Sequence, residues 1–541
     1  EKPMTWFSAT FLPPKGFPTT QFSMLEAEDV GLYKFDVLSQ RGLAKIQEGL
    51  ALAVKNQPDN PPRDINDLAF FKNDPRINAL LTKADALGCF YVESPAMRML
   101  MTKLSVENYL ELVAASSVIR PGVSQSGMMR TYILRHRFPE ERKKAHPLLL
   151  KIMPETYGVM VYQEDVIKVA HYFAGLTLGE SDVLRRGMSG KFRSRSEFLV
   201  IKEKFFQNCG AKGYRFELIK SIWDQIESFA GYAFAKGHSA SYAVESYQSL
   251  YLKAYYPLEY MTACINNFGG FYRTEFYIYE ARKLGARVEA PCIQRGAYQS
   301  VLEGVVMILG FNLVNGIERN TIRNIVRCRS DLGCFKSFEE LLDRVYIPFE
   351  QLILLIRIDA LRCFAIPRKE LLWHAHFFHD KKPKNIQSLL PLQGSSKQRG
   401  QLPELKEHRL ELDFEYLELM GFSLCSPFEL LTLPVDSNCS PLLFPSFKGK
   451  VVQTYGYLVA LKNSKSSKGH MISFGMFLDQ DGATVDTVHF QASLKRYPFS
   501  GSGIYFLEGK LVEEFGFYCL EVRYMKKQSY IEDPRFSEQA Y

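Results

Sequence analysis

The chain has 541 residues, which is more than one hydrophobic core usually serves, so three or four domains are expected. Hydrophobic residues make up 46% and charged residues 23%, as in ordinary globular proteins, and no apolar run of about eighteen residues indicates a membrane span. The net charge of +8 is a mild basic excess, which is compatible with a nucleic-acid partner but does not require one.

The ten cysteines have none of the short Cys-x-x-Cys or Cys-x-x-His spacings of zinc ribbons and redox pairs. We therefore expect reduced thiols, a cytoplasmic location and no membrane attachment. The first residues, EKPMTWFSATF, do not begin with methionine and do not resemble a signal peptide. This start predicts that the chain is part of a longer protein.

The stretch GLYKFDVLSQRGL (31–43) places one carboxylate in a strand-like apolar run. Alternation along a strand puts Lys34 and Asp36 on one face. One interpretation is a half-solvated strand with a weak ion pair. The other is a metal-binding carboxylate beside a phosphate-binding lysine, although Mg²⁺ chemistry on phosphates usually needs more than one carboxylate.

The predicted secondary structure then changes several times along the chain. Residues 1–45 are expected to form strands and loops, because prolines disfavour an early helix, and helical patterns dominate from there to about residue 282. Within them, ELIKSIWDQIESFAGYAF predicts an amphipathic helix that ends near Gly231. Shorter helices follow between residues 301 and 364.

Residues 380–403 are rich in Pro, Gly, Ser, Gln and Lys, and this composition predicts a linker. Five stretches of alternating apolar residues occupy about 447–525, with glycines in the turns between them. This pattern predicts a small closed β-barrel of the OB type.

Five segments in fixed order resemble the C-family bacterial replicative DNA polymerases, the DNA polymerase III alpha subunit and its error-prone relatives. They are GLYKFDVLSQRGL (31–43), GCFYVESPAMRML (88–100), SSVIRPGVSQSGM (116–128), ETYGVMVYQEDVI (155–167) with LGESDVLRRGM (178–188), and FAGYAFAKGHSASYA (229–243). The resemblance implies a multidomain α+β protein. Its expected parts are a remnant of a palm sheet (1–45), a large, mostly α-helical fingers region (46–285), a helix-hairpin-helix-like region (286–379), the linker (380–403), and a C-terminal region with the OB barrel (404–541).

In that family three palm aspartates bind catalytic Mg²⁺, two of them in a Pro-Asp-x-Asp-x-Asp type motif. The resemblance places Asp36 on the third and Lys34 on a basic residue near the phosphates of the incoming dNTP. No segment resembling the first motif occurs in these residues, so its aspartates are expected upstream of Glu1. Two Mg²⁺ ions need several carboxylates, so this chain alone is predicted to bind primer-template DNA and dNTPs without extending the primer.

Four cationic residues match positions at which the family's fingers bind the triphosphate. Arg185 and Arg186 match a pair of arginines, and guanidinium groups suit phosphate oxygens. The alternative is an ordinary helix ion pair between Asp182 and Arg186. Lys236 and His238 match a second nucleotide-facing segment, for which the alternative is a core histidine.

The sequence departs from the family at several places, and these departures leave both the main replicase and a divergent, translesion-type copy open. Tyr91 stands where glutamine is usual, and Cys292 and Gln294 stand in a segment that usually reads Pro-Asp-Ile-Asn. In the hairpin segment LVNGIERNTI, Gly316 is kept but Glu318 replaces the second glycine. An acidic side chain opposes a phosphate, so weaker duplex binding is expected at this hairpin, and a plain helical connector is the alternative.

Two further surfaces are implied by the resemblance. In the linker, QSLLPL offers Gln387, Leu390 and Leu392 as a peptide for the sliding clamp, with other replisome subunits as further partners. In the OB barrel, the single-stranded-DNA contacts are expected from two phenylalanines and two lysines, although alternating phenylalanines also fill barrel cores: Phe474, Phe477, Lys462 and Lys468.

Two functions follow. The first is a DNA-directed DNA polymerase that transfers nucleotides from dNTPs to a primer 3′-hydroxyl in replication or translesion synthesis. The second is a non-catalytic DNA-binding and clamp-tethering segment or split subunit. Fold alone does not separate them, because function resides in the site.

Overall fold

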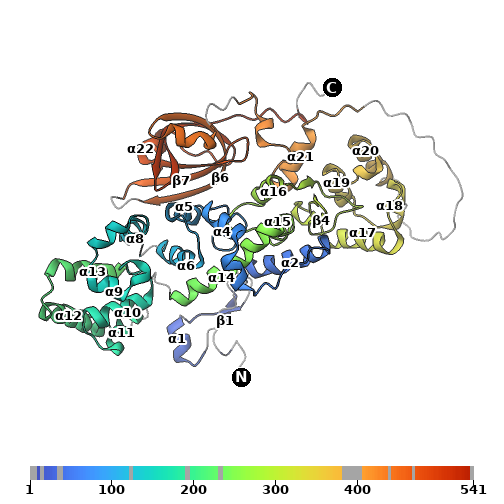
Figure 1. Cartoon of the computed structure of the whole chain (residues 1–541). Helices are drawn as coiled ribbons and strands as arrows, with labels where there is room; N and C mark the ends of the chain where they lie inside the picture. Colours follow the sequence, from blue (N-terminus) through green and yellow to red (C-terminus); the bar gives the residue numbers. More distant parts are fainter. Residues whose placement is uncertain are drawn as a thin grey trace. The chain divides into compact units, whose positions relative to one another are not determined.

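The computed structural model describes residues 6, 9–11, 18–22, 24–32, 41–120, 123, 126–188, 195–228, 235–379, 405–435, 440–465 and 469–536. The chain divides into two compact units, 1–41 and 42–541. In the first unit, β1 (Ala9–Phe11) pairs with β2 (Pro18–Thr20) in antiparallel register, and α1 (Met24–Asp29) follows (Figure 1). Lys34 and Asp36 lie outside the described residues.

The second unit begins with a large helical region. Residues 41–43 already belong to its first helix, α2. The expectation that the strand-like run extends to residue 43 is therefore wrong at its end. The helices are α2 (Arg41–Asn56), α3 (Leu68–Asn73), α4 (Pro75–Thr82), α5 (Pro95–Leu104), α6 (Tyr109–Val118), α8 (Met128–Arg137), α9 (Pro147–Ile152), α10 (Gln163–Lys168), α11 (Leu178–Met188), α12 (Arg195–Ala211), α13 (Phe216–Ser228), α14 (Lys236–Tyr255), α15 (Pro257–Asn266) and α16 (Thr274–Lys283).

Local sequence explains several of the helix starts. Asp74 and Ser94 cap α4 and α5 with their side-chain oxygens, and a proline occupies the first helical position in both helices. Asn108 caps α6 in the same way, by accepting the N–H of Glu111 at 3.1 Å. These polar side chains satisfy N–H groups that have no partner within the helix.

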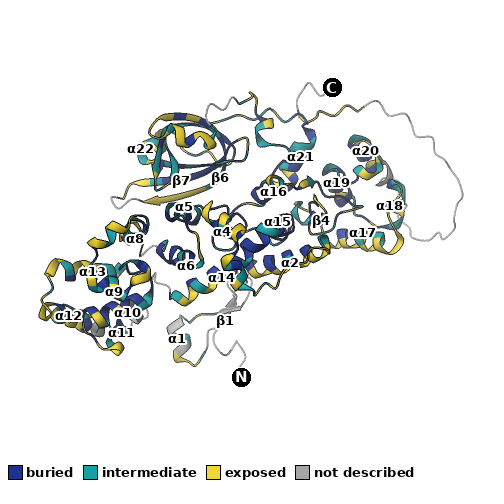
Figure 2. Ribbon diagram, in the orientation of Figure 1, coloured by how far each residue is buried: buried dark blue, intermediate teal, exposed yellow. Residues whose placement is uncertain are grey.

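Helix α14 forms the centre of this region and packs against α3, α4, α6 and α15. Its Tyr247, Leu250 and Leu252 are fully buried, and Figure 2 shows the dark, buried colour over the second half of α14 and along α15. Farther along the chain, α13 buries Ile222, Trp223 and Ile226 on one face, as its apolar spacing predicts.

A small sheet and four helices follow. The strands β3 (Arg287–Glu289), β4 (Val301–Glu303) and β5 (Val306–Ile308) form a sheet in the order β3-β5-β4, which the sequence did not predict. The helices are α17 (Arg319–Leu332), α18 (Phe338–Arg344), α19 (Phe349–Arg357) and α20 (Arg368–His379). Residues 380–404 lie outside the described residues, and with them Gln387, Leu390 and Leu392.

After α21 (Glu411–Met420), five strands close into a barrel in the order β10-β8-β7-β6-β9. They are β6 (Val451–Lys465), β7 (Met471–Leu478), β8 (Thr484–Phe490), β9 (Ile504–Glu514) and β10 (Phe517–Lys527), with α22 (Gln491–Arg496) between β8 and β9. β8 and β10 pair in parallel, and β6 joins β9 to β7. Within the described ranges, no helix is long and apolar enough to cross a bilayer.

Candidate functional site

The amino end of α14 presents two of the predicted cations. The backbone N–H of Lys236 donates to the Glu164 carboxylate at 3.0 and 3.1 Å, and its ammonium donates to Glu155. His238 lies exposed in the same turn rather than in the core. One residue on, the buried hydroxyl of Ser239 contacts that of Ser117 at 2.5 Å and so fixes the turn against α6. The positive end of the helix dipole adds to these charges.

Helix α11 carries the next predicted cation. The Nε of Arg185 donates to Asp182 Oδ1 at 2.8 Å, and the Arg185 side chain is 32% exposed. Asp182 therefore engages Arg185, whereas the sequence suggested a pair with Arg186, whose side chain lies outside the described residues. The pair holds the guanidinium in place while leaving part of it open to solvent.

An aromatic cluster supports the amino end of α14. Tyr91 has a left-handed backbone (φ 66°), and its hydroxyl donates to the Ser116 carbonyl at 2.9 Å. Its ring lies 5.1 Å from that of Tyr242 on α14, and the Arg120 guanidinium lies 5.5 Å from its centre. Burial raises the pKa of Tyr91, so the phenol stays neutral. The tyrosine that replaces the usual glutamine thus braces this part of the fold.

A buried charged group nearby was missed from the sequence. Lys45 on α2 is 3% exposed and Glu245 on α14 is 9% exposed. Burial raises the pKa of Glu245 to about 7, against the opposing effect of Lys45, and its Oε1 has no hydrogen-bond partner among the described residues. The only sequence signal was a charged residue at a core position of each helix pattern.

The hairpin segment explains how Glu318 replaces a glycine. Gly316 keeps a positive φ of 82°, and Glu318 begins α17 as its N-cap residue. The N–H of Glu318 donates to Gln351 Oε1 at 2.8 Å, and Gln351 Nε2 donates to the Gly316 carbonyl at 2.9 Å. This N–H is therefore occupied within the protein and is not available to a phosphate.

A row of arginines lies directly after this hairpin. Arg319, Arg323 and Arg327 are all exposed and recur every four residues, so they share one face of α17. They border a groove of about 280 Å³ with Tyr298, whose ring centre lies 5.3 Å from the Arg319 guanidinium. This face was not predicted from the sequence, although the four-residue spacing of its arginines is visible there.

The two phenylalanines predicted to contact single-stranded DNA differ in exposure. Phe474 on β7 is 48% exposed and lies opposite Lys462 of β6, which is also exposed. Phe477 is 0% exposed and packs in the barrel core against Tyr505, with ring centres 5.9 Å apart. The expectation of a base-stacking Phe477 is thus wrong, because its ring is enclosed. Lys468 lies outside the described residues.

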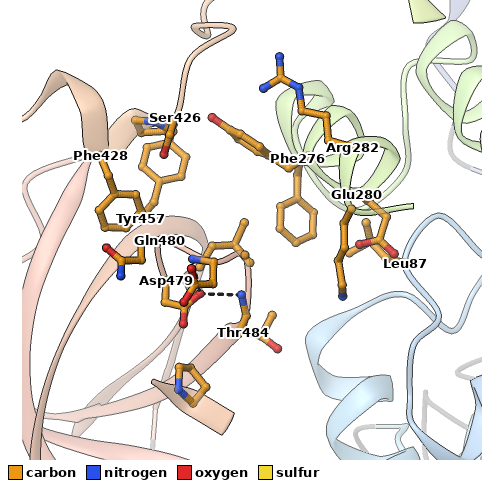
Figure 3. Close-up of a pocket in the computed structure, with 18 of the residues that line it drawn as sticks. Leu87, Phe276, Glu280, Arg282, Ser426, Phe428, Tyr457, Asp479, Gln480 and Thr484 are labelled. Carbon is orange, nitrogen blue, oxygen red and sulfur yellow. Dashed lines mark hydrogen bonds between the residues drawn. The ribbon is translucent and has the colours of Figure 1, made fainter. Parts of the chain in front are cut away.

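A cleft of about 640 Å³ lies where the barrel meets the helical region. Figure 3 shows Phe276, Glu280 and Arg282 of α16 on one side and the β7–β8 turn, with Asp479 and Thr484, on the other. At this junction Arg98 of α5 donates to Thr484 Oγ1 at 3.3 Å. Further polar contacts join the two parts, including Lys103–Glu514 at 2.5 Å.

In the part of the chain that the structure describes, no group of three or more His, Cys, Asp or Glu side chains is arranged to hold a metal ion. The described side chains therefore do not by themselves fit the Mg²⁺ site that the sequence predicts around Asp36.

Comparison with known proteins identifies the class. Residues 44–213 match the finger domain of the bacterial DNA polymerase III alpha subunit, and residues 285–371 match a helix-hairpin-helix motif. Residues 44–213 thus form a finger domain of the DNA polymerase III alpha type. The chain belongs to the DNA polymerase III alpha subunit family.

Three curated relatives are each named DNA polymerase III subunit alpha. The protein of Buchnera aphidicola is 33% identical over 380 residues, which cover 68% of this chain and 33% of the relative. That of Aquifex aeolicus is 28% identical over 491 residues (89% and 41%), and that of Pasteurella multocida is 29% identical over 527 residues (91% and 44%). The chain therefore spans a third to less than half of the length of these relatives.

Proposed function

We propose that the chain is the fingers-to-barrel part of a DNA-directed DNA polymerase that transfers nucleotides from dNTPs to a primer 3′-hydroxyl. The observation that carries this proposal is the position of Arg185 within the matched fingers (44–213), with Lys236 and His238 in the helical region that follows them. Arg185 lies partly open on α11, and Lys236 and His238 form the first turn of α14.

In this proposal the fingers bind the triphosphate of the incoming dNTP. Guanidinium and ammonium groups form charge-assisted hydrogen bonds to phosphate oxygens, and the amino end of a helix favours an anion. The carboxylates of Asp182 and Glu155 keep Arg185 and Lys236 oriented before the nucleotide arrives. Arg186 and Lys34 are proposed to join this binding set.

The catalytic metal is proposed from the family alone. Mg²⁺ would lower the barrier by stabilising the attacking and leaving oxygens, and Asp36 is the residue of this chain proposed to hold it. Nucleotidyl transfer by the 541 residues alone is not expected, since they contain no segment like the family's paired-aspartate motif.

We further propose that duplex DNA contacts the arginine row of α17 beside the hairpin. The hairpin N–H of Glu318 is already bonded to Gln351, whereas Arg319, Arg323 and Arg327 are exposed on one face. Arginine side chains bind phosphates irrespective of base sequence, so this face would position the duplex and not read it.

The first prediction tests this DNA contact. Primer-template DNA should bind the 541-residue protein more weakly as salt rises, because binding releases counterions from the phosphates. Replacing Arg319, Arg323 and Arg327 together by alanine should lower the slope of log affinity against log salt by up to about 0.9 per lost contact. Fluorescence anisotropy with labelled DNA measures this slope.

Arg287 supplies the matched control, because its side chain is 68% exposed but pairs with Glu289 and does not line the groove. Arg287→Ala should leave the slope unchanged. An unaltered slope in the triple variant would remove α17 from the DNA interface, and salt-independent binding of the wild type would contradict a phosphate-dominated mode altogether.

We also propose that the barrel is an OB-type module that binds single-stranded DNA. The support is its strand order and an exposed aromatic ring beside an exposed lysine, Phe474 and Lys462, on neighbouring strands. Such surfaces stack bases on aromatic rings and attract the backbone with cations. Lys468 is proposed to contribute from the β6–β7 connection.

The second prediction separates the two phenylalanines. Phe474→Ala should weaken binding of an oligothymidine by about 1–3 kcal/mol with little change in folding, because it removes a stacking surface. Phe477→Leu should instead lower thermal stability, because that ring fills the core. Phe216→Ala, at an exposed site on α13, is the control. Equal oligonucleotide affinity of Phe474→Ala and wild type would refute the stacking surface.

The clamp contact remains a proposal from the sequence. Gln387, Leu390 and Leu392 would dock as an extended peptide in a hydrophobic cleft of the sliding clamp. The other replisome subunits are proposed partners on the same grounds.

A further inference from the structure

The loop between α15 and α16, residues 267–273, exposes two phenylalanines. Phe268 is 61% exposed, Phe271 is 53% exposed, and the exposed Gly270 lies between them in the chain. Single exposed apolar side chains are normal on protein surfaces. Two large aromatic rings within four residues of one short loop form a distinct surface, and we call residues 267–273 the aromatic loop.

Buried groups hold the backbone of the aromatic loop in place. The N–H of Phe271 donates to Glu93 Oε1 at 2.8 Å. The N–H groups of Gly270 and Tyr272 donate to the Tyr277 hydroxyl at 2.8 and 3.3 Å. That hydroxyl donates in turn to Glu93 Oε2 at 2.9 Å. Because Glu93 is 6% exposed and Tyr277 is fully buried, three successive N–H groups of the loop are fixed to the core.

Phe268 is held in an uncommon backbone conformation. Its φ of 59° is left-handed, which is rare for a bulky side chain. The next two residues must be glycines, because a Cβ on Gly269 would clash with the Tyr277 ring and a Cβ on Gly270 with the Glu93 carboxylate. A strained residue persists only where its surroundings over-determine it, and such residues cluster at ligand-binding sites. The backbone therefore presents both rings at the surface in a fixed arrangement.

The aromatic loop contacts α2 on one side and the barrel on the other. The side-chain amide of Asn267 donates to Glu48 Oε2 of α2 at 2.6 Å. The Arg273 guanidinium donates to the Leu458 carbonyl of β6 at 3.2 Å. Lys462, part of the proposed single-stranded-DNA surface, lies four residues farther along β6, a rise of about 13 Å along a strand. The loop thus adjoins the strand that carries this surface.

The exposed area of the two rings favours one kind of ligand. Together the rings expose roughly 200 Å², whereas a stable protein interface takes about 800 Å² from each partner. The residues at the two ends of the loop, Asn267 and Arg273, are polar. An unstacked nucleobase needs only one aromatic face, and every base has one. The surface is therefore too small for a protein partner by itself but sufficient for unpaired bases.

We propose that the aromatic loop is a base-stacking site for unpaired nucleotides of the template strand, in which Phe268 and Phe271 stack on bases that pass between the helical region and the barrel. This inference rests on the proposed function, since it takes the bound strand to be the template of the polymerase. Stacking on a fixed ring is tolerant of sequence, as a template contact must be.

Two labelled DNAs of the same duplex sequence test the proposal by fluorescence anisotropy. One is a blunt duplex, and the other carries a 5′ extension of about ten thymidines on its template strand. The 541-residue protein should bind the extended DNA more tightly. Replacing Phe268 and Phe271 together by alanine should weaken binding of the extended DNA by about 5- to 100-fold and leave binding of the blunt duplex unchanged. Phe216→Ala, at a site on α13 that is 62% exposed, is the matched control and should change neither.

Photo-crosslinking locates the contact in the wild-type protein and does not depend on the folding of a variant. A single 5-iodouracil, which couples to an adjacent aromatic ring on irradiation, is placed at successive positions of the extension. After trypsin digestion, the peptide AYYPLEYMTACINNFGGFYR (254–273) should carry the DNA for at least one position. The double alanine variant should lose this crosslink but keep any crosslink to the barrel peptide that contains Phe474.

Crosslinks that fall only outside residues 254–273 would overturn the proposal. The same holds if the double variant keeps the wild-type preference for the extended DNA, which would leave the two rings to a protein partner. In both cases, salt-sensitive binding of the blunt duplex would still support the proposed function. Failure of the wild type to bind either DNA would instead contradict the proposed function itself, and this inference with it.

Discussion

Replacing Lys253 by methionine is expected to destabilise the helical region by about 3–5 kcal/mol, the usual effect of breaking a buried ion pair by removing one partner. The Lys253 side chain is 1% exposed, and its ammonium lies 2.9 Å from Asp85 Oδ1 and 2.8 Å from Glu280 Oε1. It also donates to the Leu87 carbonyl at 3.1 Å. Its loss leaves Glu280, whose side chain is 10% exposed, as an uncompensated charge in the core.

Urea unfolding followed by tryptophan fluorescence measures this effect. Trp223 is buried in the helical region, so Trp6 and Trp373 are first replaced by phenylalanine to make the signal local. Lys55→Met, at an exposed position of α2, is the control and should change stability by less than about 0.5 kcal/mol. Adding Glu280→Gln to Lys253→Met should recover part of the loss, because it removes the stranded charge. Equal midpoints for Lys253→Met and wild type would contradict the buried-charge argument.

The same cluster sets a pH dependence. Burial alone would raise the pKa of Asp85, but Lys253 outweighs it and lowers that pKa in the folded state. Burial alone would lower the pKa of Lys253, but Glu280 and Asp85 outweigh it and raise that pKa. The contribution of Asp85 to the free energy of unfolding is therefore lost as pH falls below about 4. The contribution of Lys253 is lost as pH rises above about 10. Between these two pH values the contribution of the Asp85–Lys253 pair to the free energy of unfolding is constant.

Regular period and length decided which elements the sequence predicted. The five barrel strands extend over seven or more residues of alternating pattern, and each begins close to the predicted stretch. The strands β3, β4 and β5 have three residues each, too few to establish a period of two. At the start of α2, Ile46, Gly49 and Ala53 recur with helical spacing, but the preceding alternation concealed that change of period.

The candidate site likewise contains features that the sequence predicts and features that it does not. Strict alternation already implies that Phe474 and Phe477, three residues apart, face opposite sides of β7, and the structure places one outside and one inside. Lys236, which is half-buried, and the exposed His238 were singled out from the resemblance alone. By contrast, no spacing rule brings Lys45 of α2 towards Glu245 of α14, because tertiary packing joins these distant helices.

The largest effect on activity is expected from Asp36→Asn, measured in the smallest polypeptide containing this sequence that extends a primer. Asparagine keeps the size and shape of the side chain but removes the charge proposed to hold Mg²⁺. Loss of one preorganised charge at a reacting centre lowers turnover by roughly 100- to 1000-fold, so single-nucleotide extension should fall by that factor while binding of primed DNA is retained. Asp29→Asn, at an exposed position of α1, is the matched control.

Arg185→Ala should produce a defect of a different kind in the same assay. It removes the proposed charge-assisted contact to the triphosphate, worth roughly 1.5–3 kcal/mol, so the KM for the dNTP should rise by about tenfold or more. Arg215→Ala, at an exposed position before α13, should leave KM unchanged.

Extension by Asp36→Asn at the wild-type rate would make Asp36 an ordinary strand residue. The palm assignment would then fall, and the DNA-binding and clamp-tethering function would account better for the chain.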